Sequence, residues 1–234
     1  MTKGAVPHHI AVIPDGNRRW AKRHAFSALL GHRRGADNLR AIVQRCAELG
    51  VGYVTVYSFS TENWRRPPAE IDAVFEVIAE YCLRQSDMLV TEGIRLATIG
   101  DLAPLPAPLL KVLDDTRRAT ARGTKMELTL ALNYGGHSDL CEAAKKLAAS
   151  VSSGQIALGE VDEAQLRRQL NSGGLPPVDL LIRAGGERRL SNFLLWQMAY
   201  AELYFCDLMW PEFSTEELQG AINWFAQRTR RYGS

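Results

Sequence analysis

The chain has 234 residues, of which 46% are hydrophobic and 23% charged, and its formal net charge is +2. That length suits one large domain with its own core, and so small a net charge argues against a general nucleic-acid binder. Residues 1–7 hold one lysine and no long apolar stretch, so they do not resemble a signal peptide, and no run approaches the ~20 apolar residues of a membrane span. We therefore expect a cytoplasmic protein that touches membranes only peripherally, if at all.

Apolar runs of strand length alternate with longer helical patterns along the chain, which indicates a parallel α/β architecture. Strands are expected at residues 9–13, 51–59, 94–99, 126–132, 178–182 and 202–206. Helices are expected from Arg18 onward and at residues 35–49, 69–90, 111–122, 137–150, 164–170 and 214–228. Gly50 is expected to cap the second helix, and residues 60–68 to form a polar loop.

The cysteines and the basic residues allow only general expectations. The four cysteines are far apart, form no CxxC pair and have apolar neighbours, so we expect buried free thiols at Cys46, Cys82, Cys141 and Cys206. Only six of the 28 basic residues are lysines. The arginine excess has two explanations, genomic codon bias or bidentate binding of phosphates, and local clustering has to decide between them.

The first polar cluster, Asp15-Gly16-Asn17-Arg18-Arg19, directly follows the first predicted strand. Ligands of open parallel sheets bind beyond the carboxyl ends of the strands. A carboxylate there can hold Mg²⁺ together with substrate phosphates, the glycine lets the backbone approach an anion, and the helix start supplies free N–H donors. Taken alone, the same residues also form an ordinary turn.

Two further clusters follow predicted strands. Residues 60–68, STENWRRPP, form either a capped loop that leads into a helix or a mobile flap carrying an amide and two guanidinium groups. Residues 183–191, RAGGERRLS, combine three arginines, two glycines and a hydroxyl, which favours a diphosphate cradle. No Walker loop, GxGxxG fingerprint or GxSxG elbow is present, and the five histidines show no metal-binding spacing.

Together these clusters resemble the cis-prenyltransferase family, whose best-known member is undecaprenyl diphosphate synthase. The resemblance runs from about His9 to Gly233, nearly the whole chain. It is carried by blocks in the family's order: DGN at 15–17 with Arg19-Trp20, Gly31-His32 with Gly35, FSTENW at 59–64 with Arg66-Pro67, NYGG at 133–136, and the long block from Asp179 to Pro211.

The resemblance implies a single domain over residues 1–234, with residues 1–8 as an N-terminal tail. Its fold would be a central, mainly parallel β-sheet flanked by helices and enclosing an apolar tunnel. The implied reaction is the Mg²⁺-dependent condensation of isopentenyl diphosphate with an allylic diphosphate, giving a Z-prenyl diphosphate and free diphosphate in a homodimer. Candidate tunnel residues, for which plain core packing is the alternative, are Val74, Phe75, Ile78, Cys82, Leu128, Leu130 and Leu132.

The resemblance also assigns roles to individual residues. Asp15 would be the main Mg²⁺ ligand, supported by Glu202, while Asn63 and His32 would orient or relay the proton that is lost. The allylic site would hold Gly16, Asn17, Arg18 and Arg19, and the isopentenyl site Arg183, Arg189 and Ser191. Further substrate-binding residues would be Trp20, Ser60, Glu62, Trp64 and Arg66. The C-terminal Arg231 and Gly233 would reach into the partner subunit's site.

Three positions depart from the family pattern. Pro14 stands where the family usually has a non-proline residue, Ala28 where many members place an arginine that grips the allylic diphosphate, and Arg188 where histidine or glutamine is common. We therefore expect an active enzyme with altered substrate use, making short or medium chains or coupling two allylic diphosphates head-to-middle. A non-catalytic subunit of a heteromeric enzyme is a remote alternative, because such subunits usually lose the Asp-Gly-Asn cluster, which is whole here.

Overall fold

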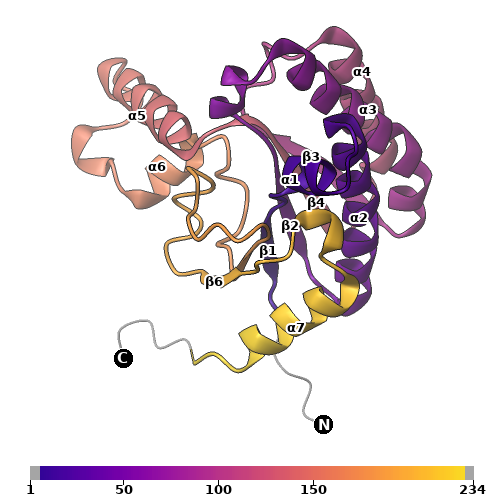
Figure 1. Cartoon of the computed structure of the whole chain (residues 1–234). Helices are drawn as coiled ribbons and strands as arrows, with labels where there is room; N and C mark the ends of the chain where they lie inside the picture. The colour runs from indigo at the N-terminus through magenta and orange to yellow at the C-terminus, as the bar shows by residue number, and fades with distance from the viewer. Residues whose placement is uncertain (1–5, 230–234) are drawn as a thin grey trace.

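A single six-stranded sheet forms the centre of the computed structural model, which describes residues 6–229 (Figure 1). The strand order is β3-β4-β2-β1-β5-β6, and every neighbouring pair is parallel, both edges included. The strands are β1 His9–Ile13, β2 Tyr53–Ser60, β3 Ile94–Ile99, β4 Met126–Tyr134, β5 Leu180–Arg183 and β6 Glu202–Phe205. The predicted α/β fold with a mainly parallel sheet is confirmed.

Helices cover the sheet unequally. They are α1 Asn17–Arg23, α2 Ala28–Leu49, α3 Pro68–Thr91, α4 Ala107–Thr120, α5 Gly136–Ser152, α6 Glu163–Gln169 and α7 Thr215–Ala226, with short 3₁₀ turns η1 Thr61–Arg65, η2 Leu158–Glu160 and η3 Trp210–Glu212. Figure 1 shows α2, α3 and α4 on one side of the sheet and α5 and α6 on the other. None of the helices between residues 6 and 229 combines the length and apolar character of a transmembrane segment.

Both faces of the sheet are buried at the strands β1, β4 and β5, which explains the continuous apolar runs of these strands. Ile10 and Val12 of β1 belong to a large core shared with α2, α3, α4 and α7. Ala11 and Ile13, which alternate with them, belong to a smaller core closed by the irregular segment 175–198. All five side chains of β1 are therefore buried, and the chain leaves this strand directly at Asp15.

Most element boundaries fall close to their predicted positions, and the larger differences have local causes. Helix α2 begins at Ala28 rather than Gly35, because the Ser27 hydroxyl caps it by accepting the N–H of Leu30 at 3.2 Å. Helix α4 begins at Ala107, directly after Pro106, rather than at Lys111. The predicted loop at 60–68 contains the short turn η1.

The cysteines only partly match the prediction of buried thiols. All four are free, but Cys46 and Cys82 alone are fully buried, and burial raises the pKa of each of these two thiols to about 12. Cys206 is partly buried and Cys141 is exposed. The prediction is wrong for Cys141 because α5 lies on the outside of the molecule and turns this residue toward solvent.

Candidate active site

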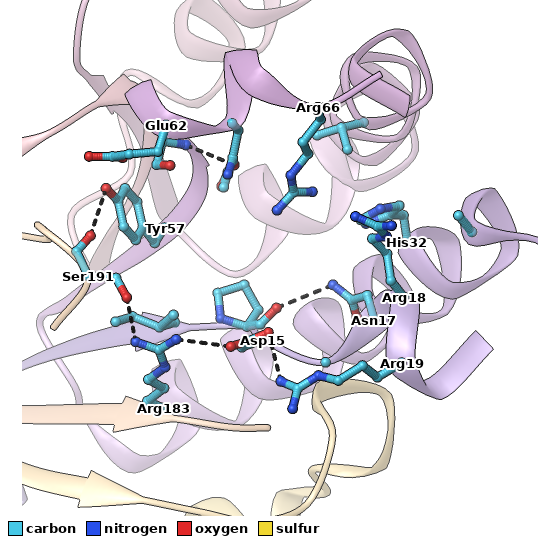
Figure 2. A pocket seen from close by; sticks show the side chains of 18 of the residues that line it. Asp15, Asn17, Arg18, Arg19, His32, Tyr57, Glu62, Arg66, Arg183 and Ser191 are labelled. Atoms are coloured by element: carbon cyan, nitrogen blue, oxygen red, sulfur yellow. Dashed lines mark hydrogen bonds and ion pairs between the residues drawn. The ribbon is translucent and has the colours of Figure 1, made fainter. Parts of the chain in front are cut away.

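A cavity of about 1010 Å³ opens at the carboxyl ends of β1, β2 and β5 (Figure 2). This is the edge of a parallel sheet where ligands bind. The structure brings most of the predicted site residues together there: Asp15, Gly16, Asn17, Arg18, Arg19, His32, Ser60, Glu62, Asn63, Arg66, Arg183, Arg189 and Ser191. Their convergence from segments more than a hundred residues apart follows from β1 lying between β2 and β5.

Asp15 is held between two guanidinium groups (Figure 2). Its Oδ2 accepts a hydrogen bond from Arg183 Nη2 at 3.0 Å, and its Oδ1 accepts one from Arg19 Nη2 at 3.1 Å. Arg183 is only 3% exposed, and its other terminal nitrogen donates to Ser191 Oγ at 2.7 Å and to the carbonyl of Arg189. Arg183 therefore links the first polar cluster to the third.

Glycine is required at two points around Asp15. Gly16 has φ 103°, a left-handed conformation that side chains disfavour. Gly185 has φ 88°, and a Cβ there would lie 2.7 Å from Arg19 Nη2 and 3.0 Å from the carbonyl oxygen of Asp15. The two cationic clusters can approach one another because these positions carry no side chain.

The cavity carries an excess of positive charge. The cations that line it are Arg18, Arg19, Lys22, Arg66, Arg183 and Arg189, whereas its carboxylates are Asp15 and Glu62. Glu70, just outside this lining, pairs with Arg18 at 3.2 Å and with Arg66 at 3.0 Å, so it holds the two guanidinium groups near one another. Such a field favours ligands with several negative charges, and diphosphates fit it.

His32 lies on α2 beside Arg18 in this cavity (Figure 2). Its Nε2 is buried and has no hydrogen-bond partner within the described chain. Burial lowers the pKa of the imidazole to about 4, with further lowering by Arg66 and Arg18 and partial opposition from Glu70. The ring is therefore neutral at pH 7 and retains a free nitrogen for a ligand or a proton.

Two predicted site residues lie near the cavity without lining it. Trp20 packs against His24 and Phe26, with ring centroids 4.6 and 5.8 Å away, and it is Phe26 that reaches the cavity. The Trp64 indole donates to Asn133 Oδ1 at 2.8 Å and packs edge-on against Phe59. Both tryptophans support the segments that carry the site.

The structure does not bring Glu202 to Asp15 within the chain. Glu202 starts β6 and is level with Leu180, which in turn is level with Ile10 of β1. Ile10 lies five residues before Asp15, so at ~3.3 Å per residue the two residues are about 17 Å apart along the strand direction. Glu202 instead pairs with Arg228 at 3.1 Å. Within one subunit these two carboxylates therefore lie toward opposite ends of the strands, and the predicted metal role of Glu202 stays a prediction.

The tunnel candidates are mainly core residues. Val74 lines the cavity, whereas the other six are buried in the large core between the sheet and the helices: Phe75, Ile78, Cys82, Leu128, Leu130 and Leu132. These six residues therefore pack in the core, which was the alternative to lining a tunnel. The predicted residues Arg231 and Gly233 lie outside the described residues.

Several cavity residues were not predicted. They include Lys22, Phe26, Tyr57, Ser58 and Asn192. The Tyr57 hydroxyl donates to the carbonyls of Tyr134 at 3.1 Å and Ser191 at 3.3 Å, and burial raises its pKa. Tyr57 and Ser58 lie inside a predicted strand. The sequence pattern alone does not show that the C-terminal end of β2 borders a cavity.

The cavity has two carboxylates, Asp15 and Glu62, that could bind a metal ion. No group of three or more histidine, cysteine, aspartate or glutamate side chains with metal-binding geometry occurs between residues 6 and 229. Mg²⁺ commonly needs only one or two carboxylates when substrate phosphates complete its coordination. Asp15, with 30% of its side chain exposed and facing the cavity, fits that kind of site rather than an all-protein cage.

Comparisons with known proteins agree on one family. The family model described as undecaprenyl diphosphate synthase matches residues 13–233. An isoprenyl transferase of Heliobacterium mobile is 41% identical over 97% of this chain and 88% of its own length. The (2E,6E)-farnesyl-diphosphate-specific ditrans,polycis-undecaprenyl-diphosphate synthase of Pseudomonas aeruginosa is 43% identical over 97% of this chain and 91% of its own length.

A solved structure of similar shape comes from a plant. The crystal structure of lavandulyl diphosphate synthase from Lavandula x intermedia, in complex with dimethylallyl diphosphate, superposes with a TM-score of 0.95 at 34% identity. The match covers 98% of this chain and 99% of the plant chain.

Proposed function

The chain belongs to the undecaprenyl diphosphate synthase family and is a prenyl-transferring enzyme, and we propose that it condenses isopentenyl diphosphate with an allylic diphosphate. The product would be a Z-prenyl diphosphate, with diphosphate released. One observation carries the proposal: Asp15 lies between Arg19 and Arg183, on the border of two cationic clusters in one cavity. Two diphosphates can therefore bind side by side on either side of a single carboxylate.

The two clusters would divide the substrates between them. Arg19, Arg66 and the backbone N–H groups at the start of α1 would bind the allylic diphosphate, and Arg183, Arg189 and Ser191 the isopentenyl diphosphate. In the reaction the allylic C–O bond breaks and its electron pair leaves with the diphosphate. The isopentenyl double bond forms the new C–C bond, and a proton is then lost. The arginines stabilise the charge that grows on the leaving group.

Mg²⁺ fits this site through Asp15, whose carboxylate faces the cavity. When bound, the ion would neutralise charge on a diphosphate and favour its departure. Arg183 keeps its bonds to Ser191 and to the Arg189 carbonyl if Asp15 turns toward the ion, so its buried charge stays partly satisfied.

The departing proton has two candidate acceptors or relays in the cavity. His32 is neutral at pH 7 and has an unpaired buried nitrogen. Asn63 lines the cavity with its side chain oriented by the N–H of Ser60, which donates to Asn63 Oδ1 at 3.1 Å. We assign the orienting or relaying role to this pair.

The enzyme would work as a cytoplasmic homodimer, the state implied by the resemblance. Support comes from β6, an edge strand around which Tyr200, Leu203 and Leu208 are exposed. The chain leaves α7 beside this strand, because Arg228 pairs with Glu202. Arg231 and Gly233 follow three and five residues later, which suits a contribution to a partner's site.

A second candidate reaction is irregular coupling of two allylic diphosphates. Ala28 lines the cavity at the position where many members have an arginine, so the allylic site lacks one expected guanidinium group. The similar plant structure is a lavandulyl diphosphate synthase holding dimethylallyl diphosphate. Both observations favour a site that accepts short allylic substrates in a non-standard arrangement.

Product analysis tests the two reactions. Purified protein with Mg²⁺ receives dimethylallyl, geranyl or farnesyl diphosphate, each with and without isopentenyl diphosphate. We expect linear Z-products only when isopentenyl diphosphate is present, whereas branched products from allylic diphosphates alone would establish irregular coupling. Loss of all turnover after removal of Mg²⁺ by EDTA would support metal dependence, and unchanged turnover would refute it.

Two variants sharpen this experiment. Ala28→Arg adds a guanidinium group to the allylic side and should lower the KM for the allylic diphosphate about tenfold, the effect of one charge-assisted hydrogen bond. Asp15→Asn should lower kcat by about 10²-fold or more, because it removes the charge that would hold the metal. If Asp15→Asn turned over as fast as the wild type, the proposed function would be overturned.

A further inference from the structure

Asn192 lies where three separate segments meet at the cavity. It follows Ser191 of the third cluster and itself lines the cavity. Across from it are residues 60–66, here called the flap, which carry Glu62 and Asn63 into the cavity. Beside it is the turn from β4 into α5, at residues 135–137.

The side chain of Asn192 uses both ends of its amide. Nδ2 donates to Glu62 Oε1 at 2.9 Å, and Oδ1 accepts the backbone N–H of His137 at 2.8 Å. A carboxylate cannot donate and a backbone N–H cannot accept, so the two partners determine which end of the amide faces which segment. Its carbonyl oxygen also accepts the N–H of Gly136 at 2.7 Å.

The backbone and the packing hold Asn192 in this position. Ser191 and Asn192 have φ values of 51° and 63°, and consecutive left-handed residues other than glycine are uncommon. A Cβ at Gly135 would lie 2.6 Å from Thr61 Oγ1 and 2.8 Å from Asn192 Nδ2. The flap and the third cluster can touch only because this position is glycine.

We propose that Asn192 is a positioning residue that fastens the flap to the third cluster, so that the two diphosphate sites behave as one connected unit. Only the effect of this fastening on catalysis rests on the proposed function. Ser191, next to Asn192, is bonded to Arg183, and Arg183 is bonded to Asp15. An anion bound at Arg183 and Ser191 would therefore stabilise the segment that holds the flap, and with it the position of Asn63 in the cavity wall.

The substitution Asn192→Asp separates this role from a purely structural one. Aspartate keeps the acceptor for the His137 N–H, but it sets a carboxylate against the Glu62 carboxylate. The reciprocal change Glu62→Gln supplies a new donor, so the double variant N192D/E62Q can restore the bond in the opposite direction. Asn223→Asp on the exposed face of α7 adds the same charge away from the cavity and serves as the matched control.

Amide hydrogen exchange of the flap in the full-length, ligand-free chain measures the fastening without any substrate. We expect N192D to speed exchange at residues 60–66 about tenfold or more, which corresponds to the loss of one such bond. N192D/E62Q should return to within about threefold of the wild type, as should N223D. The inference would be overturned if residues 60–66 exchanged as slowly in N192D as in the wild type. It would also be overturned if they exchanged as fast in N192D/E62Q as in N192D.

Two further measurements keep the outcomes distinct. If N192D lowers the melting temperature too far for the exchange experiment, Glu62→Ala removes the same bond from the exposed side and should open the flap equally. In turnover assays N192D should raise the KM for both diphosphates, and N192D/E62Q should recover affinity relative to N192D alone. Absence of prenyl transfer in the wild type would refute the proposed function and leave the exchange result to decide on Asn192.

Discussion

At the scale of single residues, His32 shows how surrounding charges prepare a side chain for chemistry. Its ring is largely buried between Arg66 and Arg18, so protonation would add a third positive charge to a poorly solvated region. Burial is the largest cause of the low pKa, and the guanidinium groups add to it. A neutral imidazole beside two arginines leaves their charges available for a diphosphate.

The pKa of His32 predicts a pH-dependent stability. Its value falls from 6.5 in the unfolded chain to about 4 in the folded protein, so only the unfolded chain binds this proton between those limits. The stabilising contribution is therefore complete above pH 6.5 and lost as the pH falls to about 4, an effect of about 3 kcal/mol at most. Denaturant unfolding of His32→Asn should show a flatter pH profile across that window.

The control for this prediction is His137→Asn, an exposed histidine at the start of α5. It should keep the pH profile of the wild type. A His32→Asn profile as steep as that of the wild type would show that His32 is not buried in its neutral form.

At the scale of elements, the contact of α1 with α2 determines where Asn17 lies. Gly31 and Gly35 are one turn apart on α2 and face α1. A Cβ at Gly31 would lie 2.4 Å from the Asn17 carbonyl oxygen, and one at Gly35 would lie 2.4 Å from Asn17 Oδ1. The two helices approach closely enough to form the cavity wall only because α2 carries glycine at both positions.

Gly31→Ala should therefore destabilise the protein although alanine favours helix. The gain in helix propensity is about 1 kcal/mol, but the clash involves backbone atoms, and such overpacking costs roughly 1–3 kcal/mol. We expect a lower melting temperature and weaker allylic diphosphate binding, because Asn17 is displaced. Gly220→Ala in α7, where a Cβ meets no atom within 4 Å, should instead stabilise by about 0.5–1 kcal/mol. Equal thermal shifts in both variants would contradict this account.

At the scale of the whole molecule, the parallel sheet separates the two carboxylates that the sequence predicts as metal ligands. Asp15 lies beyond the carboxyl edge and Glu202 at the opposite edge, bonded to Arg228. One chain therefore presents a cationic cavity at one edge and the start of its exposed edge strand at the other. This arrangement suits an assembly in which a second copy meets the chain along β6.

Shared sites in such a dimer can be tested by complementation. Asp15→Asn and Arg231→Ala chains, each with its own tag, are co-expressed, and the doubly tagged heterodimer is purified. Each homodimer should be nearly inactive, whereas the heterodimer keeps one intact site of two and should show about half of wild-type activity. A heterodimer of Asp15→Asn with Asp15→Ala is the control and should stay inactive. Activity of the first heterodimer no higher than this control would refute a contribution of Arg231 across subunits.

Local patterns determined much of this protein by themselves. The strands 9–13 and 94–99 are as predicted: the first is a continuous apolar run, and both are rich in β-branched residues and end at turn residues. The three polar clusters follow strand ends, and parallel strands end at one edge, so their meeting in one cavity could be expected. The start of α2 at Ala28 could not, because a serine cap eight residues upstream of the predicted start at Gly35 is a weak signal.

Only the tertiary structure decided which polar groups face one another. Sequence spacing carries no information on strand register, and register is what places Glu202 level with Ile10 and far from Asp15. Packing of helices and loops likewise decides the exposure of Cys141 and the core position of Phe75. It also brings Asn192 to Glu62 and His137, which are 130 and 55 residues away in the chain. Local sequence determines strands, turns and charge, because those follow from neighbouring residues; contacts between distant segments follow from packing, which no single segment encodes.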